Sequence, residues 1–355
     1  VENKSFHFED LYFKRILETF KKYSRKKYVP QKIFKEDIPR FLLVTNDLKP
    51  VDYWNNQFHH ITSECPLPCK FTRNVSEVKN VDAVVIHLDT LLSRSILEYN
   101  LGARDPKQPW VMMTFETPLM ANKTYRLRYN DFNYLFNRTM TYRRDSDVII
   151  THGFVVSQED SKYLPYHWRV SWEHTQSIYT KPSKVAVGTL LSNCKDTSGR
   201  LQYIKMLQKY IDVDIYGDCG KLKCGTPLYV ASRYKPYTDR CLKKLGREYK
   251  FYLAFENSFC KDYGSEKIYN ILYYPVVPIV YGGIKYSEIL PPHSYINAAD
   301  YSPEELADYL NFLLENPQEY NRYFEWKDRY VIVDYWWREN HLRFVYQTSR
   351  PKFLQ

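Results

Sequence analysis

Short apolar runs rich in β-branched and aromatic residues recur along the chain, and longer mixed segments separate them. The first series comprises residues 41–45, 82–88, 110–115 and 148–151. The second series comprises residues 185–191, 213–217, 250–255 and 276–281. Runs of this length predict buried strands, and the segments between them have room for connecting helices. The pattern therefore predicts an α/β protein with two groups of strands.

Two connecting segments carry specific helix signals. Apolar residues fall on one helical face at Leu201, Ile204, Leu207 and Ile211. The tetrapeptide Ser302-Pro-Glu-Glu305 supplies an N-cap serine, a proline at the first helical position and the glutamate of a capping box. We therefore predict one helix over residues 201–211 and another that begins at Pro303.

The two groups of strands predict two consecutive domains. The chain becomes polar between residues 172 and 184, where Lys181-Pro182 interrupts it. A length of 355 residues also fits two domains of roughly 150 residues each. We expect a stem-like or linker segment over residues 1–40 and a C-terminal segment over 331–355. Between them we expect an N-terminal domain over 41–175 and a C-terminal domain over 176–330.

Composition and charge exclude several classes of protein. Hydrophobic residues make up 44% and charged residues 26%, as in ordinary globular proteins. The net charge is 51 − 41 = +10, but the basic run at residues 21–27 is typical of a solvated surface, and no nucleic-acid-binding motif accompanies it. No Gly-x-Gly-x-x-Gly and no Gly-x-x-x-x-Gly-Lys-Ser/Thr occurs, which argues against dinucleotide and P-loop sites.

The longest apolar stretch, residues 269–284, is too short for a bilayer span of about 20 residues, and Pro275 and Pro278 interrupt it. The sequence begins without methionine and without an apolar signal core. We therefore expect a processed product or a piece of a longer chain, with any membrane anchor upstream.

Cysteines and glycosylation sequons favour the secretory pathway. The seven cysteines are Cys65, Cys69, Cys194, Cys219, Cys224, Cys241 and Cys260. Two close pairs, Cys65–Cys69 and Cys219–Cys224, have the spacing of metal knuckles, but the second half of a zinc site is missing. Disulfide-closed short loops are the favoured reading of both pairs. Four sequons begin at Asn3, Asn74, Asn122 and Asn137.

The densest candidate site lies in residues 249–283. A buried strand ends at Glu256-Asn257, and after a loop Ser265-Glu266-Lys267 opens a helix. Ligands of α/β sheets bind at the carboxyl ends of strands. A helix start together with the charge of Lys267 suits a diphosphate, and the Glu266 carboxylate can accept hydrogen bonds from the two hydroxyls of a ribose.

This segment resembles the signature of the α1,3-fucosyltransferases, in which Phe-Glu-Asn-Ser is followed by Asp-Tyr-x-Thr-Glu-Lys and then by Val-Pro-Val/Ile-Val. Here Ser265 replaces the threonine and keeps a hydroxyl, whereas Gly264 replaces an apolar residue, a change expected to loosen the loop. Three further blocks resemble the family in the same order: residues 114–118, 137–147 and 191–203.

The resemblance implies the GT-B fold, in which two Rossmann-like domains face each other across a cleft. It also implies inverting transfer of L-fucose from GDP-fucose to the 3-hydroxyl of N-acetylglucosamine. Glu116 matches the proposed base, and Arg200 and Lys267 match the residues that neutralise the diphosphate. Glu266 matches the ribose ligand, Asn257 and Tyr263 are expected to line the nucleotide site, and Glu256 either contacts the donor or holds the loop.

The same resemblance bears on metals and on two further carboxylates. Because Arg200 and Lys267 supply positive charge, we expect no obligatory metal; added divalent cations could still stimulate. Asp145 and Asp147 lie beside Arg143 and Arg144. Ion-pair networking at a domain seam and contact with substrate are both open for them.

The family divides by acceptor. Cys219-Gly-x-x-x-Cys224 and residues 192–203 resemble the invertebrate branch that modifies the innermost Asn-linked N-acetylglucosamine of N-glycans, although the cysteine-rich tail of that branch is absent. Outer-branch transfer, of the Lewis or LacdiNAc type, is the alternative. Two more alternatives are a non-catalytic glycan-binding protein and fucosylation of a protein hydroxyl. We expect an enzyme of the Golgi lumen whose type II membrane anchor lies upstream.

Overall fold

The computed structural model describes residues 14, 38–45, 70–88, 93–164, 169–170, 185–224 and 239–334. The chain divides into two compact units. Unit 1 comprises Val1–Glu18 and His152–Trp337, and unit 2 comprises Thr19–Thr151 and Arg338–Gln355. The predicted polar seam at residues 172–184 and the basic run at 21–27 lie outside the described residues, as do Cys65, Cys69 and Asn3.

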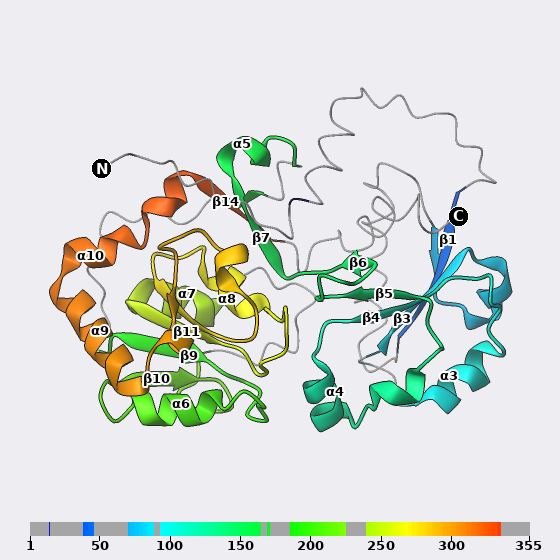
Figure 1. The fold of residues 1–355 in the computed structure, drawn as a ribbon, viewed down its shortest axis with the longest axis horizontal. Coiled ribbons are helices and arrows are strands. Elements are labelled where there is room, and N and C mark those ends of the chain that lie inside the picture. Colours follow the sequence, from blue (N-terminus) through cyan, green and yellow to red (C-terminus); the bar gives the residue numbers. More distant parts are fainter. Residues whose placement is uncertain are drawn as a thin grey trace. The chain divides into compact units, whose positions relative to one another are not determined.

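Unit 2 contains a six-stranded sheet in the order β2-β1-β3-β4-β5-β6, and every neighbouring pair is parallel. Its strands are β1 (Arg40–Val44), β2 (Lys70–Thr72), β3 (Ala83–His87), β4 (Trp110–Thr114), β5 (Arg138–Thr141) and β6 (Val148–Ile149). Its helices are η2 (Val75–Asn80), α3 (Arg94–Leu101), α4 (Pro118–Tyr125) and η4 (Tyr129–Phe132). Figure 1 shows α3 and α4 on the same side of this sheet.

Alternation along the strands of unit 2 divides its core between the two faces of the sheet. Leu42, Val84 and Ile86 pack with apolar side chains of α3 and α4. Leu43 and Val85, the intervening residues, join a second cluster with Met113 and Met140. Strands with both faces buried are expected in a parallel sheet, which explains their continuous apolar runs.

Unit 1 contains a five-stranded parallel sheet in the order β10-β9-β11-β12-β13. Its strands are β9 (Val187–Leu190), β10 (Val213–Tyr216), β11 (Phe251–Phe255), β12 (Val277–Tyr281) and β13 (Ile296–Asn297). Its helices are α6 (Arg200–Leu207), α7 (Arg240–Glu248), α8 (Glu266–Ile271), η8 (Tyr286–Glu288), η9 (Ala298–Asp300), α9 (Pro303–Glu315), α10 (Pro317–Arg322) and η10 (Glu325–Asp328).

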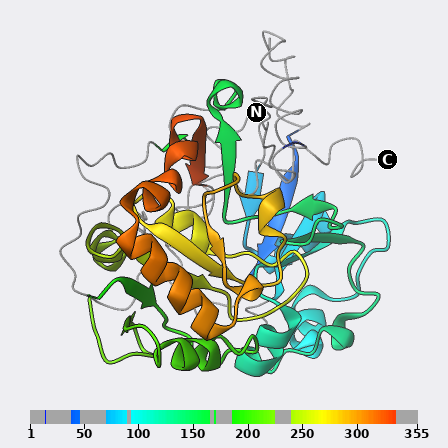
Figure 2. The same ribbon diagram turned by 60° about the vertical axis from the view of Figure 1, so that its left-hand side comes forward.

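The helices of unit 1 cover both faces of this sheet. Phe251, Leu253 and Phe255 of β11 point into a core that α6 and α9 complete. Helices α7 and α8 pack on the opposite face, where β9 approaches α7 closely. Figure 2 shows α9, in orange, in front of the yellow strands of the sheet. Ser302 and Glu305 form the predicted capping box at the start of α9.

A second sheet of unit 1 is antiparallel and joins distant parts of the chain. Strand β14 (Tyr330–Asp334) pairs with β7 (Gly153–Ser157) and β8 (Arg169–Val170), and α5 (Gln158–Ser161) follows β7. This pairing agrees with the assignment of β7 and β8 to unit 1, whereas we expected residues up to 175 to belong to the N-terminal domain. It also brings residues 331–334, expected in a C-terminal segment, into unit 1.

Each of the eight strands predicted from apolar runs overlaps an observed strand, so the predicted α/β fold with two parallel sheets is confirmed. The predicted helix over 201–211 is shorter, because α6 ends at Leu207. Strands such as β2, β5 and β13 were not predicted, since they are short or partly polar. Among the described residues, no helix is both long and apolar enough to cross a bilayer.

Candidate active site

The candidate site of unit 1 lies where the strand order reverses. Strand β9 is flanked by β10 on one side and by β11 on the other, so the connections after β9 and β11 leave in opposite directions. In parallel sheets a crevice forms at this point and binds ligands. The segment after β9 ends in Arg200, the first residue of α6. The segment after β11 contains all the other predicted donor-binding residues: Glu256, Asn257, Tyr263, Glu266 and Lys267.

Hydrogen bonds join these two segments. The Thr197 backbone N–H donates to the carbonyl oxygen of Asn257 at 2.7 Å, and the Ser198 hydroxyl donates to the carbonyl oxygen of Glu256 at 2.7 Å. Gly199, with φ +75°, then turns the chain into α6, a conformation that glycine adopts without strain. The sequence analysis missed Thr197 and Ser198, because hydroxyl residues in a polar loop carry no distinctive signal.

A disulfide between Cys194 and Cys219 holds the first of these segments, and a second disulfide joins Cys224 to Cys241. The predicted short loop closed by Cys219 and Cys224 is wrong, because each of these cysteines pairs with another residue. The backbone explains the pairing: the Cys219 N–H donates to the carbonyl oxygen of Leu191, which brings the loop after β10 beside the loop after β9.

Glu256 holds the loop that precedes α8. Its side chain is 1% exposed, and its carboxylate accepts hydrogen bonds from the Ser265 backbone N–H at 2.7 Å and from the Ser265 hydroxyl. The Lys267 Nζ lies 3.3 Å from the same carboxylate. Of the two roles that the sequence left open for Glu256, these contacts support the second, in which it holds the loop.

Gly264 does not leave this loop loosely packed. The residue is buried, and a methyl group at its Cα would lie 3.1 Å from Cδ1 of Ile284. The loosening that we expected from the absence of an apolar side chain is therefore not observed, because Ile284 fills the space.

Lys267 and Glu266 form a charged pair at the start of α8. The Lys267 Nζ donates to the Ser265 hydroxyl at 2.7 Å and lies 3.4 Å from Oε1 of Glu266. Burial opposes ionisation of Glu266, but Lys267, His152 and hydrogen bonds outweigh it and lower the pKa of this carboxyl to about 2. Glu266 is thus a carboxylate at neutral pH, with 37% of its side chain exposed and able to accept hydrogen bonds.

His152 is a site residue that the sequence analysis missed. Its Nδ1 lies 3.6 Å from Oε2 of Glu266, and its side chain is 6% exposed. Burial lowers the pKa of His152 to about 4, so the imidazole is neutral at pH 7 and Lys267 supplies the positive charge beside Glu266. Gly153 permits this contact, because a Cβ there would lie 2.7 Å from the ring of Tyr269 in α8.

Arg200 is almost completely buried, at 1% exposure. Its Nη1 donates to the carbonyl oxygen of Phe255 at 2.8 Å and its Nη2 to that of Asn193 at 2.6 Å. Burial lowers the pKa of the guanidinium, and the negative charges of nearby Glu256 and Asp196 oppose that shift. An arginine remains charged under such conditions, so a buried positive charge lies beside the loop that carries Glu256.

Buried polar atoms without a described hydrogen-bond partner lie close to these charges. They include Nε of Arg200 and Oδ1 of Asn257. Asn257 is 5% exposed and Tyr263 is 3% exposed. A buried donor or acceptor that lacks a partner costs about 1–3 kcal/mol, which a bound ligand can recover. The structure therefore brings the six donor-binding candidates together, and two of them have unsatisfied polar atoms.

Glu116, the predicted base, lies in unit 2 after β4. The Thr114 hydroxyl donates to the carbonyl oxygen of Glu116 at 3.2 Å and lies 3.0 Å from the Tyr129 hydroxyl. Thr117, the next residue, is the N-cap of α4, and its hydroxyl accepts from the N–H of Met120. These contacts fix the backbone on both sides of Glu116, and the side chain is partly exposed.

Asp145 and Asp147 have local partners. The Asp145 carboxylate accepts from Nε of Arg143 at 3.0 Å. Asp147 accepts from the backbone N–H of Thr139 at 2.9 Å and lies 3.7 Å from Nε of Arg138. Of the two readings that the sequence left open, these contacts favour ion pairing and hydrogen bonding within unit 2. No cluster of three or more potential metal ligands occurs in the part of the chain that the structure describes.

Comparison with known proteins places these observations in a family. Residues 46–153 match the family Fucosyltransferase, N-terminal, and residues 180–348 match Glycosyltransferase family 10 (fucosyltransferase) C-term. The chain is 33% identical to glycoprotein 3-alpha-L-fucosyltransferase A of Drosophila melanogaster over 84% of this chain and 55% of the relative. It is 34% identical to a 3-galactosyl-N-acetylglucosaminide 4-alpha-L-fucosyltransferase of Bos taurus, over 73% of this chain and 64% of that relative.

The chain thus spans less than two thirds of the length of these curated relatives. Among solved structures, a crystal structure of an α1,3-fucosyltransferase with GDP-fucose matches with a TM-score of 0.56 at 14% identity, over 95% of this chain and 97% of that one. That likeness shows a shared fold. Together with the two family matches, it shows that the chain belongs to the glycosyltransferase family 10 fucosyltransferases.

Proposed function

We propose that this chain transfers L-fucose from GDP-fucose to the 3-hydroxyl of an N-acetylglucosamine residue, with inversion at the anomeric carbon. The observation that carries the proposal is the cluster in unit 1, where Arg200 and Lys267 surround the loop after β11 and two buried polar atoms lack partners. GDP-fucose in the crystal structure of the α1,3-fucosyltransferase with the same fold supports this choice of donor.

The donor side of the reaction needs positive charge on the leaving group. As the bond between fucose and phosphate breaks, its electron pair stays on the diphosphate oxygen. Arg200 and Lys267 stabilise that negative charge, so an obligatory metal is not needed. The ionised Glu266 accepts hydrogen bonds from ribose hydroxyls, and Asn257 and Tyr263 line the nucleotide.

The acceptor side of the reaction needs a base. The acceptor oxygen forms the new bond to the anomeric carbon, and its proton moves to the Glu116 carboxylate. The hydrogen bonds of Thr114 and Thr117 fix the backbone on both sides of Glu116. GDP leaves from one face of the anomeric carbon while the acceptor oxygen attacks the opposite face, which inverts the configuration at that carbon.

The acceptor that we propose is the innermost Asn-linked N-acetylglucosamine of N-glycans. Similarity to an insect glycoprotein 3-alpha-L-fucosyltransferase supports it, as do the cysteine-containing blocks at 192–203 and 219–224. Similarity of almost the same degree to a bovine enzyme named for a galactosyl-N-acetylglucosaminide favours outer-branch transfer as the second candidate. Disulfides and sequons agree with a protein of the secretory pathway, and the location that we propose is the Golgi lumen, with a membrane anchor upstream of this chain.

Release of GDP from GDP-fucose tests the proposal. The protein is assayed in parallel with a GlcNAc-terminated N-glycopeptide and with free N-acetyllactosamine. We expect release with the glycopeptide, and fragmentation should map fucose to its innermost GlcNAc. Release with lactosamine alone would replace the core assignment by outer-branch transfer. Release with neither acceptor, although glycan still binds, would favour a non-catalytic glycan-binding protein.

A further inference from the structure

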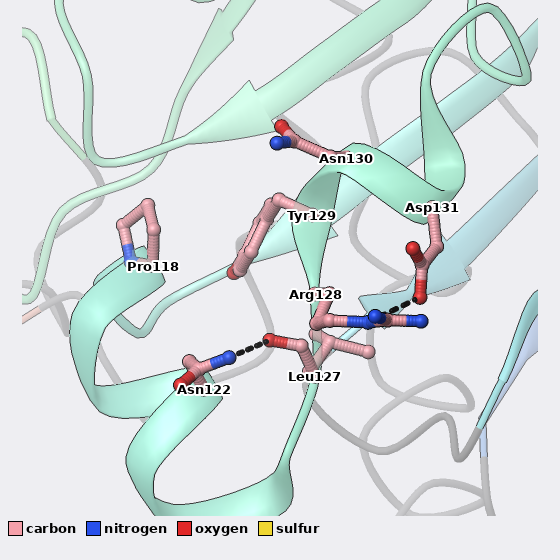
Figure 3. Close-up of a pocket in the computed structure, with 7 residues that line it drawn as sticks. All are labelled: Pro118, Asn122, Leu127, Arg128, Tyr129, Asn130 and Asp131. Carbon is pink, nitrogen blue, oxygen red and sulfur yellow. Dashed lines mark hydrogen bonds and ion pairs between the residues drawn. The ribbon is translucent and has the colours of Figure 1, made fainter.

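Unit 2 contains a pocket of about 390 Å³ beside the loop that carries Glu116. The pocket is lined by α4, by η4 and by the chain between them: Pro118, Asn122, Leu127, Arg128, Tyr129, Asn130 and Asp131. Figure 3 shows the Tyr129 ring projecting toward Pro118 and Asn122 of α4. Its volume falls within the range of small-molecule sites.

The pocket is connected directly to the backbone of Glu116. Tyr129 in its wall lies 3.0 Å from the Thr114 hydroxyl, and that hydroxyl donates to the carbonyl oxygen of Glu116. Pro118, also in the wall, follows Glu116 by two residues and begins α4. A group bound in the pocket is therefore held by the same short segment that positions the proposed base.

The lining has the chemistry of a site for a neutral sugar. The partly exposed Tyr129 ring offers apolar surface, which packs against the C–H face of a pyranose. The single cation and single anion, Arg128 and Asp131, pair at 3.1 Å and leave no net charge for a phosphate. Two amides, of Asn122 and Asn130, supply donors and acceptors for hydroxyl or acetamido groups.

The amides differ in how they are used. The Asn122 Nδ2 donates to the carbonyl oxygen of Leu127 at 3.3 Å, which fixes the side chain and leaves Oδ1 as an acceptor. No hydrogen bond joins the Asn130 amide to another of the described residues that line the pocket (Figure 3). Asn130 is exposed and lines the pocket, so its amide is accessible to a ligand there.

We infer that this pocket binds a neutral sugar residue of the acceptor glycan and that Asn130 is a contact that determines acceptor affinity. The inference rests on the proposed function, because it takes the acceptor to be a carbohydrate attacked near Glu116. It extends that function by assigning acceptor recognition to the segment between residues 118 and 131.

Two changes at Asn130 test the pocket. Asn130→Ala removes the amide, and Asn130→Phe places a large side chain in the pocket. Because position 130 is exposed, either substitution is compatible with folding. Asn133→Ala is the matched control, because Asn133 is exposed in the same segment but does not line the pocket. We expect Asn130→Ala to raise the acceptor KM about fivefold, the effect of one lost hydrogen bond, and Asn130→Phe to raise it more.

The KM for GDP-fucose is expected to stay unchanged in both variants, and Asn133→Ala should match the parent protein in both constants. An unchanged acceptor KM in both Asn130 variants, with melting temperatures equal to the parent, would overturn the inference while leaving the proposed transfer reaction intact.

Binding without turnover separates this inference from the proposed function. Saturation-transfer NMR with N-acetyllactosamine and with the GlcNAc-terminated glycopeptide reports contact even if no transfer occurs. Contact that Asn130→Phe abolishes and Asn133→Ala preserves would support the pocket even where the transferase assay fails. Asn122 also begins a sequon, so intact-mass measurement is needed; an N-glycan on Asn122 would occupy the pocket and overturn the inference.

Discussion

The Arg200 side chain both stabilises the fold and has a polar atom available to a ligand. Two of its nitrogens donate to the carbonyl oxygens of Phe255, at the end of β11, and of Asn193, in the segment after β9. Its Nε has no described partner. A lysine has neither the planar fork nor the number of donors to satisfy these positions, so charge alone does not explain why this residue is an arginine.

At Glu116 we expect loss of transfer without loss of donor binding. Glu116→Gln keeps the size of the side chain and removes its basicity, and general-base catalysis contributes about 10²–10⁴-fold. The turnover number should therefore fall at least about 100-fold, measured as GDP release with glycopeptide, while calorimetry should give an unchanged Kd for GDP. Glu98→Gln is the control in the same unit, because Glu98 forms an exposed ion pair with Arg94 on α3. A parallel loss of GDP binding would show that Glu116 has a structural role.

At Lys267 the effect on donor affinity and the effect on stability should appear together. Its side chain is 16% exposed and its ammonium group lies between Glu256 and Glu266, so Lys267→Met removes a cation from beside both carboxylates. We expect the Kd for GDP to rise about 10-fold to 100-fold and the melting temperature to fall. The control is Lys261→Met, an exposed lysine in the same loop. Unchanged GDP affinity would contradict the assigned role of Lys267.

At the scale of elements, the site is formed by two segments that follow neighbouring parallel strands. The segment after β9 is held by Thr197, Ser198 and the Cys194–Cys219 disulfide, and the segment after β11 is held by Glu256. Parallel strands present their carboxyl ends at one edge of the sheet, so residues far apart in sequence meet there. The order of strands thus determines where the site forms.

Removal of the Cys194–Cys219 disulfide should therefore affect both stability and donor binding. This disulfide joins two cysteines that are 25 residues apart. The double variant Cys194→Ser with Cys219→Ser is expected to lose about 3 kcal/mol of the free energy of unfolding. Arg200 hydrogen-bonds to Asn193, next to Cys194, so the Kd for GDP should also rise. The disulfide Cys224–Cys241 is the control, since it closes 17 residues and holds a different segment.

In the control, the double variant Cys224→Ser with Cys241→Ser should lose a similar free energy of unfolding but keep the affinity of the parent protein for GDP. Urea denaturation and calorimetry measure the two quantities. Equal GDP affinity in both double variants would show that the first disulfide does not order the site.

At the scale of the whole molecule, stability should depend on pH through His152. Its pKa falls from 6.5 to about 4 on burial, so the unfolded chain binds the proton more tightly than the folded one. The stabilisation by neutral His152 is therefore complete above pH 6.5 and lost as the pH falls toward 4. The difference between these pKa values corresponds to about 3 kcal/mol.

Urea denaturation at pH 7, 6, 5 and 4 measures this dependence, and His152→Gln should reduce its slope in that range. Glu266 acts in a lower range, because its pKa is depressed: its contribution is present above pH 4.5 and lost toward pH 2. The same slope in parent and His152→Gln proteins would show that His152 does not titrate on unfolding.

Apolar runs and helix caps are local signals, and they were sufficient to predict the strands of the two parallel sheets and the start of α9. The sequence also indicated the fucosyltransferase family and the segments of the site, since residues 256–267 are contiguous. Three features could be found only from the three-dimensional fold: the partners of Glu256, the pairing of Cys194 with Cys219 and the position of His152 beside Glu266. These contacts depend on which strands are neighbours in the sheet and on how closely a helix packs against a strand. Neither property can be predicted from a short stretch of sequence.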